Sequence, residues 1–461
     1  MSAIKMKRVL TTPALVAFGL AYMVPLGIFT TYGQVTIFTD GHLPIAYVIT
    51  LMMILFTALS YCRMANKYPI AGSAYSYVVH TFGNRMGFLI GWTQILDYLF
   101  LPILNYLVLG IYLHQAMPSI PAYVFVLTSL ILVSTLNYLG IKLINSVNFI
   151  LIFVQFVFIT LFVILAFSNV EHTTDTLLKP LLCTTDDISG LFSGAAVLCL
   201  AFLGFDAIAT LAEESTNAKT NLPKAILWTV IIAGCIFLIM SYASHLAYPN
   251  WHDFENDPDV ASLYVVGKVG EISAIGKTIM TNFFLAAYLT GVFASAMTAQ
   301  TSVSRIFFAM GREGVLPKKI FYRLHKRFHT PHLSIIFVAT FSLLSLVLPL
   351  DLVVSMISFG ALMSFTFVNL CVIKTYINRK AHLTIEILFK YGVLPAIGLL
   401  LSLWLWTSLD EMAILIGIIW FLIGLAYLLY MTRMFTRAIP SLSDEEVKAL
   451  LSDEEAKALI I

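Results

Sequence analysis

Two stretches interrupt apolar runs that are long enough to cross a bilayer: Leu20-Ala21-Tyr22-Met23-Val24-Pro25-Leu26-Gly27-Ile28-Phe29 and Leu200-Ala201-Phe202-Leu203-Gly204-Phe205-Asp206-Ala207. Proline cannot donate a backbone hydrogen bond, and glycine costs helix stability. Unpaired backbone is costly in hydrocarbon, so such breaks persist only where they line a cavity or contact a ligand. Interrupted helices at corresponding positions of two halves indicate a substrate site. The pattern predicts that spans 1 and 6 are each two half-helices, meeting at Val24–Gly27 and Leu203–Asp206.

The composition is that of an integral membrane protein. The chain has 461 residues, of which 59% are hydrophobic and 11% are charged, and its mean hydropathy is +0.90. A soluble protein carries about 25% charged residues. The apolar runs are close to the ~20 residues that span hydrocarbon. We therefore expect an all-α membrane protein with twelve transmembrane helices, at about 12–38, 43–62, 87–116, 121–140, 146–168, 189–212, 224–248, 278–304, 332–349, 352–373, 388–407 and 412–431.

Lysine and arginine are unevenly distributed between the connecting segments. If the N-terminus lies inside the cell and the spans alternate, only Lys179, Lys268 and Lys277 of the 27 Lys and Arg residues fall outside. Because inner loops carry the excess of positive charge, this bias predicts that both termini are cytoplasmic. We expect the seven basic residues of 305–331 to anchor the topology and to contact anionic lipid. The net charge of +2 gives no reason to expect nucleic acid as a partner.

The order of the spans favours an inverted repeat. Because five is odd, spans 1–5 and 6–10 start on opposite sides of the membrane, as in a pseudo-two-fold repeat. We expect one integral-membrane domain over 1–440, with repeat one at about 10–168, repeat two at about 189–378 and extra helices at about 388–431. The tail 441–461 holds two copies of one nine-residue pattern, each with a capping box, which predicts short amphipathic helices on the cytoplasmic side.

Several strings carry a resemblance to a known family. They include Lys67-Tyr68-Pro69-Ile70-Ala71-Gly72-Ser73-Ala74-Tyr75, Gly204-Phe205-Asp206-Ala207 and Met310-Gly311-Arg312-Glu313-Gly314-Val315-Leu316-Pro317. With them the chain resembles the amino acid–polyamine–organocation superfamily. The resemblance implies a LeuT-type five-plus-five inverted repeat with interrupted helices 1 and 6, followed by helices 11 and 12. Through Leu96-Asp97-Tyr98-Leu99-Phe100-Leu101-Pro102 and Phe359-Gly360-Ala361-Leu362, the chain most resembles bacterial putrescine importers.

Two positions depart from those relatives. Thr30 stands where the putrescine importers carry Asp in span 1. Gly27-Ile28-Phe29 resembles the loop with which amino-acid permeases hold a substrate carboxylate on backbone N–H groups, but Pro25 replaces its first glycine and has no N–H. The substrate is therefore either a diamine or an α-amino acid. The resemblance places it at the two breaks, against Leu26, Gly27, Ile28, Thr30 and Gly204.

Two acids fall at membrane depth. Asp97 lies ten residues after Gly87, which is about 15 Å along a helix and near the middle of a ~30 Å core. Asp206 stands at the second break. An acid at that depth indicates a functional site, so we expect both to bind ammonium groups, with cation–π contact from Tyr98 and Phe202. The alternatives are structural: Asp97 joining helices through a hydrogen bond, and Asp206 capping the inner half-helix.

Glu213 and Glu214 follow Asp206 by two helical turns and lie nearer the cytoplasm. They are candidates for an inner gate with a Lys or Arg, or for the group that carries a coupling proton; the alternative is that they are interfacial helix-end acids. Some family members use a Lys in span 5 in place of a bound cation, and Gln155 occupies the matching position here. Glutamine does not titrate, and no sodium cage is recognisable, so we expect proton coupling through Glu213 or Glu214.

These features favour a secondary active transporter that imports a small cationic amine, such as a putrescine-like diamine, by proton symport with alternating access. The first alternative is an α-amino-acid permease of the same superfamily. A membrane-bound sensor without transport activity is a second, although only 24 residues follow Arg437. The sequence contains no catalytic constellation, phosphate-binding loop or metal-ligand spacing. We therefore expect no enzyme, no cofactor and no metal, and the sequence leaves the oligomeric state open.

Overall fold

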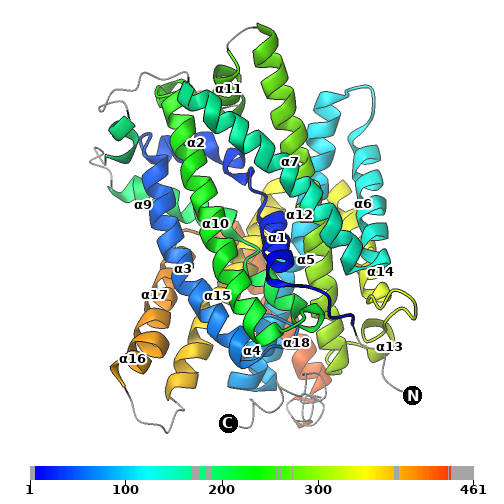
Figure 1. Cartoon of the computed structure of the whole chain (residues 1–461). Coiled ribbons are helices and arrows are strands. Elements are labelled where there is room, and N and C mark those ends of the chain that lie inside the picture. The colour runs from blue at the N-terminus through cyan, green and yellow to red at the C-terminus, as the bar shows by residue number, and fades with distance from the viewer. Residues whose placement is uncertain are drawn as a thin grey trace.

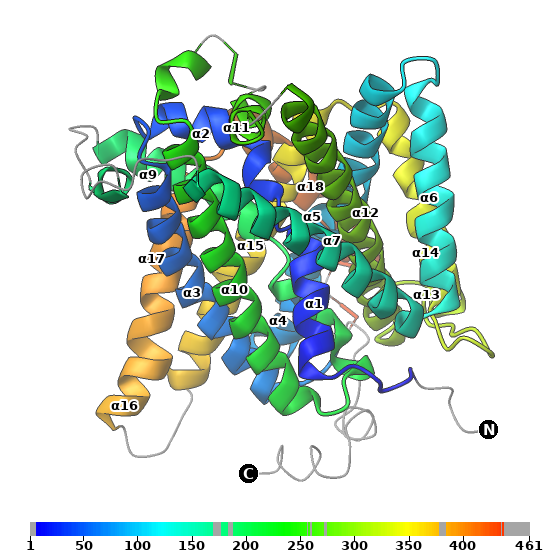
Figure 2. The same cartoon turned by 45° about the horizontal axis from the view of Figure 1, so that its top comes forward.

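The computed structural model describes residues 6–437, apart from 169–176, 183–187, 256, 259–260, 272–273, 378–383 and 435. The regular elements of this part are helices, and most of their axes run along one direction (Figures 1 and 2). The prediction of an all-α membrane protein is confirmed. The predicted helices of the tail 441–461 lie outside the described residues.

The helices of the first half are α1 (Thr12–Met23), η1 (Gly27–Thr30), α2 (Tyr32–Phe38), α3 (Leu43–Lys67), α4 (Ala74–Phe82), α5 (Asn84–Ala116), α6 (Ala122–Leu139) and α7 (Ile141–Ser168). The helices that follow, up to residue 269, are η2 (Lys179–Leu181), α9 (Ile188–Leu198), η3 (Cys199–Phe202), η4 (Asp206–Glu214), α10 (Ala218–Ala247), η5 (Trp251–Phe254) and α11 (Ala261–Val269). The remaining helices are α12 (Ala274–Arg312), α13 (Lys318–Phe321), α14 (His332–Phe341), η7 (Ser342–Leu346), α15 (Leu350–Ile377), α16 (Ile385–Leu388), η8 (Phe389–Val393), α17 (Leu394–Trp406) and α18 (Glu411–Met431).

Eleven helical segments among the described residues are long and apolar enough to cross a membrane, one fewer than predicted. The difference is the predicted span 332–349. There the chain forms only His332–Leu346, in which α14 gives way to the 3₁₀ turns of η7. Ten α-helical and five 3₁₀ residues extend about 25 Å, which is less than the ~30 Å of a hydrocarbon core.

Helix α5 lies in the middle of the bundle. It packs against α12 and α15, while α3 packs along α10. The last two long helices lie on the outside: α17 contacts α15 and α3, and α18 contacts α15 and α5. The residues that form the two predicted breaks are thereby enclosed by helices that are far apart in the sequence.

Both predicted interruptions are confirmed. Helix α1 ends at Met23, and Val24 has a φ of +55°, as expected where Pro25 disfavours a helical preceding residue. In the second run, α9 continues as η3, which ends at Phe202. Gly204 then has a φ of +121° before η4 begins. Glycine is needed there because a Cβ at Gly204 would lie 2.2 Å from the ring of Tyr22. The two breaks are therefore in direct contact.

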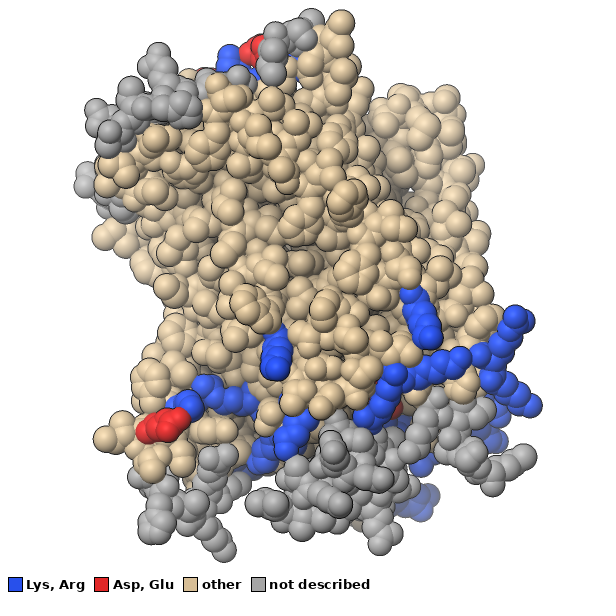
Figure 3. All heavy atoms as spheres, viewed as in Figure 1, with Lys and Arg blue, Asp and Glu red and all other residues tan. Residues whose placement is uncertain are grey.

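The basic side chains gather at one end of the bundle. Figure 3 shows Lys and Arg in a band across the end where α13, α16 and the described N-terminus lie. We call this the basic end; it includes the last residues of α3 and α12 and the segment 313–331. Helices α2 and α11 lie at the opposite end (Figure 1).

Candidate functional site

Backbone groups of the first break form hydrogen bonds with one another. The Gly27 N–H donates to the Val24 carbonyl oxygen at 2.6 Å, and the Phe29 N–H donates to the Leu26 carbonyl at 3.1 Å. The side chains of Leu26 and Ile28 are fully buried. Pro25 has no N–H to offer. In this conformation the loop therefore does not present the N–H of Gly27 to a substrate carboxylate.

The second break places an acid at the start of a helical segment. Asp206 is the first residue of η4, where a carboxylate is favoured by the unpaired N–H groups of the helix start. Its Oδ2 accepts a hydrogen bond of 2.5 Å from the Tyr98 hydroxyl, and its backbone carbonyl accepts one of 3.3 Å from Ser73 Oγ. Asp206 is thus held by α5 and by the segment before α4, which fits the capping alternative as well as a binding role.

A cavity of about 240 Å³ opens between the breaks and the end of the bundle that carries α2. Its lining side chains come from both interrupted runs and from α5, α12 and α15, and none of them is charged. Thr30 Oγ1 and the Tyr288 hydroxyl, both in the lining, form a 3.0 Å hydrogen bond. Ser295 Oγ donates to the Tyr22 carbonyl at 2.8 Å. The cavity therefore offers hydroxyl groups and apolar walls to a small molecule.

Asp97 and Asp206, the two acids expected to bind ammonium groups, do not line this cavity in the present conformation. Both are nearly completely buried, at 2% and 1% exposure. They are close enough for one charge to act on the other, and Tyr22, which does line the cavity, is within electrostatic reach of both. The α5 backbone at Asp97 packs closely on Gly360 of α15. Tyr22 is therefore a cavity-lining side chain that lies near both acids.

Neither acid has a cationic partner among the ion pairs of the described residues. Asp97 Oδ1 is buried without a hydrogen-bond partner. The structural alternative, in which Asp97 joins helices through a hydrogen bond, therefore has no support at this oxygen. A buried charge without a partner is strongly unfavourable. A proton on Asp97, or a cation from elsewhere, would relieve this unfavourable burial.

The two aromatic side chains predicted to contact an ammonium group have other contacts here. The Tyr98 hydroxyl donates to Asp206, and the Tyr98 ring meets the edge of Tyr22 at 6.3 Å. Phe202 is fully buried against Phe237, with ring centroids 5.2 Å apart. Neither belongs to the cavity lining, so a cation–π role for either would require a different conformation.

Buried ion pairs lie on the other side of the breaks, toward the basic end. Arg305 donates to both oxygens of Glu214, from Nε and from Nη2, at 3.0 Å each, and Arg312 pairs with Glu213. Arg305 lies ten residues, or about 15 Å, further along α12 than the cavity residue Ser295. Both arginines were predicted to be lipid-facing anchors. That prediction is wrong, because they are 0% and 3% exposed.

The pairing bears on the interpretation of Glu213 and Glu214. The two ion pairs match the expectation of an inner gate formed with an arginine. The other expectation, that Glu213 or Glu214 carries a coupling proton, stays a prediction. The backbone adds to the closure, since the carbonyl of Glu214 accepts hydrogen bonds from the N–H groups of Val9 and Leu10 at 2.8 and 2.9 Å.

A further hydrogen bond extends this closure to α4. The Tyr75 hydroxyl donates to Glu313 Oε2 at 2.5 Å, and the Tyr75 N–H donates to Gln94 Oε1 at 2.8 Å. Burial raises the pKa of Glu313, which follows the last residue of α12. This carboxyl therefore takes up a proton at a higher pH than an exposed glutamate would. Sequence reasoning missed this contact, although Tyr75 and Glu313 both lie in the family-like strings.

Two amide side chains on one face of α7 also remain unpartnered. Both polar atoms of Gln155 and both of Asn148 are buried without hydrogen bonds. Gln155 lies against the first break, because a Cβ on Gly291 would meet its Oε1 at 2.7 Å and a Val24 methyl at 2.8 Å. Gln155 therefore lies beside the first interrupted run. No group of metal-ligating side chains occurs among the described residues.

Interrupted membrane helices, a substrate-sized cavity between them and buried ion pairs beyond them define the class of membrane permeases. The family model for amino acid permeases matches residues 14–439, so the chain belongs to this family, within the amino acid–polyamine–organocation superfamily. It is a family of transporters, not of enzymes.

Comparison with curated proteins finds relatives with different substrates. The chain is 36% identical over 452 residues to the low-affinity putrescine importer PlaP of Escherichia coli strain K12, covering 96% of this chain and 98% of that protein. It is 28% identical over 452 residues to the branched-chain amino acid permease BcaP of Bacillus subtilis strain 168, covering 92% and 93%. It is 25% identical over 407 residues to the cationic amino acid transporter 4 of Mus musculus, covering 80% and 60%.

Proposed function

We propose that the protein imports putrescine or a similar small diamine. The observation that carries this proposal is the pair of buried acids beside the breaks, neither of which has a cationic partner within the described structure. A cationic cargo supplies the missing positive charge, whereas a neutral cargo does not. The 36% identity to a putrescine importer over nearly the whole chain supports the same substrate class.

The two acids have different surroundings, which suggests different roles. Asp206 accepts a hydrogen bond from Tyr98 and lies at a helix start, so its charged form is supported and it is the partner for an ammonium group. Asp97 lacks such support at Oδ1, so it is the group that takes a proton. One proton on the pair removes the repulsion between two close carboxylates. The cargo ammonium and the proton then cross together, which is symport.

The distribution of charge supports an orientation. The basic end of Figure 3 faces the cytoplasm of a bacterial inner membrane, with both termini on that side. The cavity then opens toward the outside, and the Glu214–Arg305 and Glu213–Arg312 pairs close the inside. Release of cargo into the cell requires these pairs to separate, which assigns Glu213 and Glu214 to an inner gate of an alternating-access cycle.

The contact between the breaks supports a LeuT-type architecture. Repeat one at about 10–168 and repeat two at about 189–378 each begin with an interrupted helix, and Gly204 of the second lies against Tyr22 of the first. Helices α17 and α18, which pack on the outside, are the two helices beyond the repeat. A substrate site at the interface of such repeats is the general arrangement for these transporters.

An α-amino-acid permease is the second candidate, and one observation counts against it. A carboxylate needs free backbone N–H groups, but Pro25 has none and the Gly27 N–H is bonded to Val24. The hydroxyl groups of Thr30 and Tyr288 remain as donors for such a substrate.

Uptake into proteoliposomes distinguishes the two. Radiolabelled putrescine should accumulate, unlabelled diamines should compete, and branched-chain amino acids should not. Competition by a neutral amino acid, without any by putrescine, would replace the proposal with the amino-acid permease. A membrane-bound sensor without transport activity would bind the diamine, seen as a thermal shift, but accumulate nothing.

A further inference from the structure

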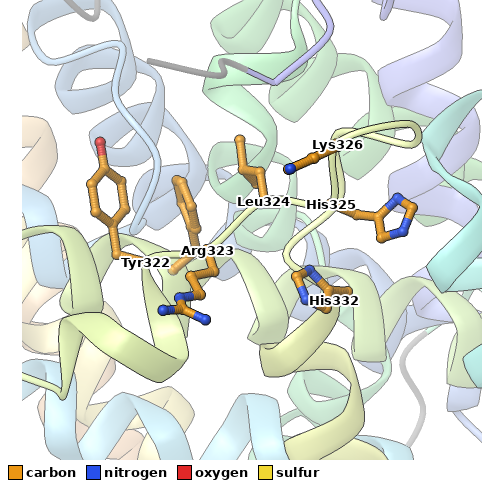
Figure 4. Close-up of a pocket in the computed structure, with 7 residues that line it drawn as sticks. Tyr322, Arg323, Leu324, His325, Lys326 and His332 are labelled. Atoms are coloured by element: carbon orange, nitrogen blue, oxygen red, sulfur yellow. The ribbon is translucent and has the colours of Figure 1, made fainter. Parts of the chain in front are cut away.

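A second hollow lies at the basic end, away from the breaks. It has a volume of about 590 Å³ and is lined by Phe308 of α12, by residues 322–326 after α13 and by His332 at the start of α14. Figure 4 shows the lining side chains Arg323, His325, Lys326 and His332, with Lys326 and His325 extending in opposite directions from neighbouring positions. Four nitrogen-bearing side chains from residues 323–332 therefore line one hollow, and none of them lines the cavity between the breaks.

The segment that forms this hollow is held in place by hydrogen bonds. The His325 N–H donates to the Thr330 carbonyl at 2.8 Å, and Thr330 Oγ1 donates to the Tyr138 carbonyl of α6 at 3.0 Å. The ring of His325 stacks on Phe328, with centroids 5.0 Å apart. Backbone N–H groups of Arg327 and Phe328 donate to His325 Nδ1 at 3.3 Å, which leaves Nε2 as the donor. The hollow is thus preorganised rather than a chance gap between loops.

The charge around this hollow has one sign. Residues 314–350 contain five Lys or Arg and three His but no acid. None of the ion pairs found in the described structure includes Arg323 or Lys326. The nearest acid in sequence, Glu313, is buried and accepts the hydrogen bond from Tyr75. Within the described residues, the positive charge of Arg323 and Lys326 is therefore not balanced by an ion pair.

We propose that this hollow binds a phosphate group. A guanidinium offers a planar fork of donors to phosphate oxygens, an ammonium adds a point charge, and an imidazole N–H adds a neutral donor. Arg323, Lys326 and His325 supply one of each. None of these three residues lines the cavity between the breaks.

The phosphate has two possible sources, and they share this chemistry. The first is the phosphodiester of an anionic lipid, because basic pockets between membrane helices on the cytoplasmic side bind such headgroups. This source rests on the proposed orientation. The second is a soluble phosphate monoester, which needs only that the hollow be open to water. Lipid is the favoured source, since the hollow lies between ends of helices that enter the bilayer.

Thermal-shift titrations of purified protein in neutral detergent test the site without measuring transport. Phosphatidylglycerol in mixed micelles should stabilise the protein, and phosphatidylcholine should not. Arg323→Gln with Lys326→Gln should weaken the apparent affinity at least tenfold, at about fivefold per lost charge. The matched control is Lys318→Gln with Lys319→Gln, which removes the same charge from α13 outside the hollow and should change the affinity less than twofold.

Glycerol 3-phosphate in a parallel titration separates the sources. Stabilisation by this soluble ester, lost in the Arg323/Lys326 variant alone, would support the site with a soluble ligand. Equal losses in the two double variants would indicate diffuse surface charge and overturn the proposal. The proposal would also be wrong if the ligands bound only after deletion of 441–461, because the acidic tail would then be the occupant. Unchanged melting without ligand shows that each variant is folded.

Discussion

Removal of the Arg305 guanidinium tests the inner gate most directly. Arg305 and Glu214 are 0% and 3% exposed, and two hydrogen bonds of 3.0 Å join them. In Arg305→Gln, the Glu214 carboxylate stays in place without its charge partner. Breaking a buried pair in this way costs about 3–5 kcal/mol, because the remaining charge is desolvated and unpaired.

This cost destabilises the conformation in which the inner end is closed, because Glu214 is buried there. In the open conformation, water can solvate Glu214. At ~1.4 kcal/mol per factor of ten, the balance between closed and open conformations should shift toward open by roughly 100-fold to 3,000-fold. Arg305→Lys, which keeps the charge but loses the fork, should give an intermediate shift. Lys390→Gln removes one partner of the exposed Lys390–Glu386 pair and should leave the balance unchanged.

Labelling of a cysteine behind the gate measures this shift. Ser302 is fully buried one turn before Arg305, so Ser302→Cys is placed in a background in which the five native cysteines are replaced. In inverted membrane vesicles, an impermeant thiol reagent should label this cysteine slowly in the parent and much faster with Arg305→Gln. If labelling of a folded Arg305→Gln protein remains at the parental rate, the pair does not hold the inner end closed.

The remaining predictions concern cargo and coupling. Asp206→Asn should weaken putrescine binding about tenfold or more, since a hydrogen bond to a charged group contributes ~1.5–3 kcal/mol, while membrane abundance stays normal; unaltered binding by calorimetry would exclude it as the ammonium partner. Asp97→Asn should retain binding but remove the acceleration of uptake by an inward proton gradient, and loss of binding instead would restore it as a second ammonium partner. Thr30→Asp should tighten putrescine binding by a similar factor because Thr30 lines the cavity, whereas an amino-acid permease would lose affinity. Uptake by the parent protein should need no sodium, and strict sodium dependence would disprove proton coupling.

The helix breaks could be predicted from sequence because their cause is local. Pro25 and Gly204 act on backbone groups within one or two residues of themselves. Proline alone was not sufficient evidence, because Pro102 and Pro223 lie inside the continuous helices α5 and α10. What distinguished the two breaks was their recurrence at corresponding positions in two halves. That recurrence is a property of the whole chain and is visible in one sequence.

The partners of the buried charges could not be predicted in the same way. Glu214 and Arg305 are 91 residues apart, and nothing in either segment indicates that they meet. Arg305 and Arg312 were grouped with the other basic residues of 305–331 as anchors, because the sequence alone does not separate buried arginines from exposed ones. Burial decides between an anchor and a gate, and burial follows from the packing of η4 against α12. The depth of Asp97 in the membrane, which rests on helix rise alone, stays a prediction.

The absence of Asp97 and Asp206 from the cavity lining has a consequence for the proposed transport cycle. A ligand shifts a conformational equilibrium only by the difference in its affinity for the two states. In the proposed cycle, a cation in the uncharged cavity gains little until it reaches Asp206, and we expect Tyr22, which lines the cavity and packs on Gly204, to move to admit it. Because Tyr22 belongs to the first interrupted run and Gly204 to the second, that movement separates the two breaks. Neutralisation of the acids would then accompany rearrangement of the segment that also carries Glu214, and this rearrangement would change the distance between Glu214 and Arg305. In this way a charged cargo, but not a neutral one, would favour opening of the inner gate.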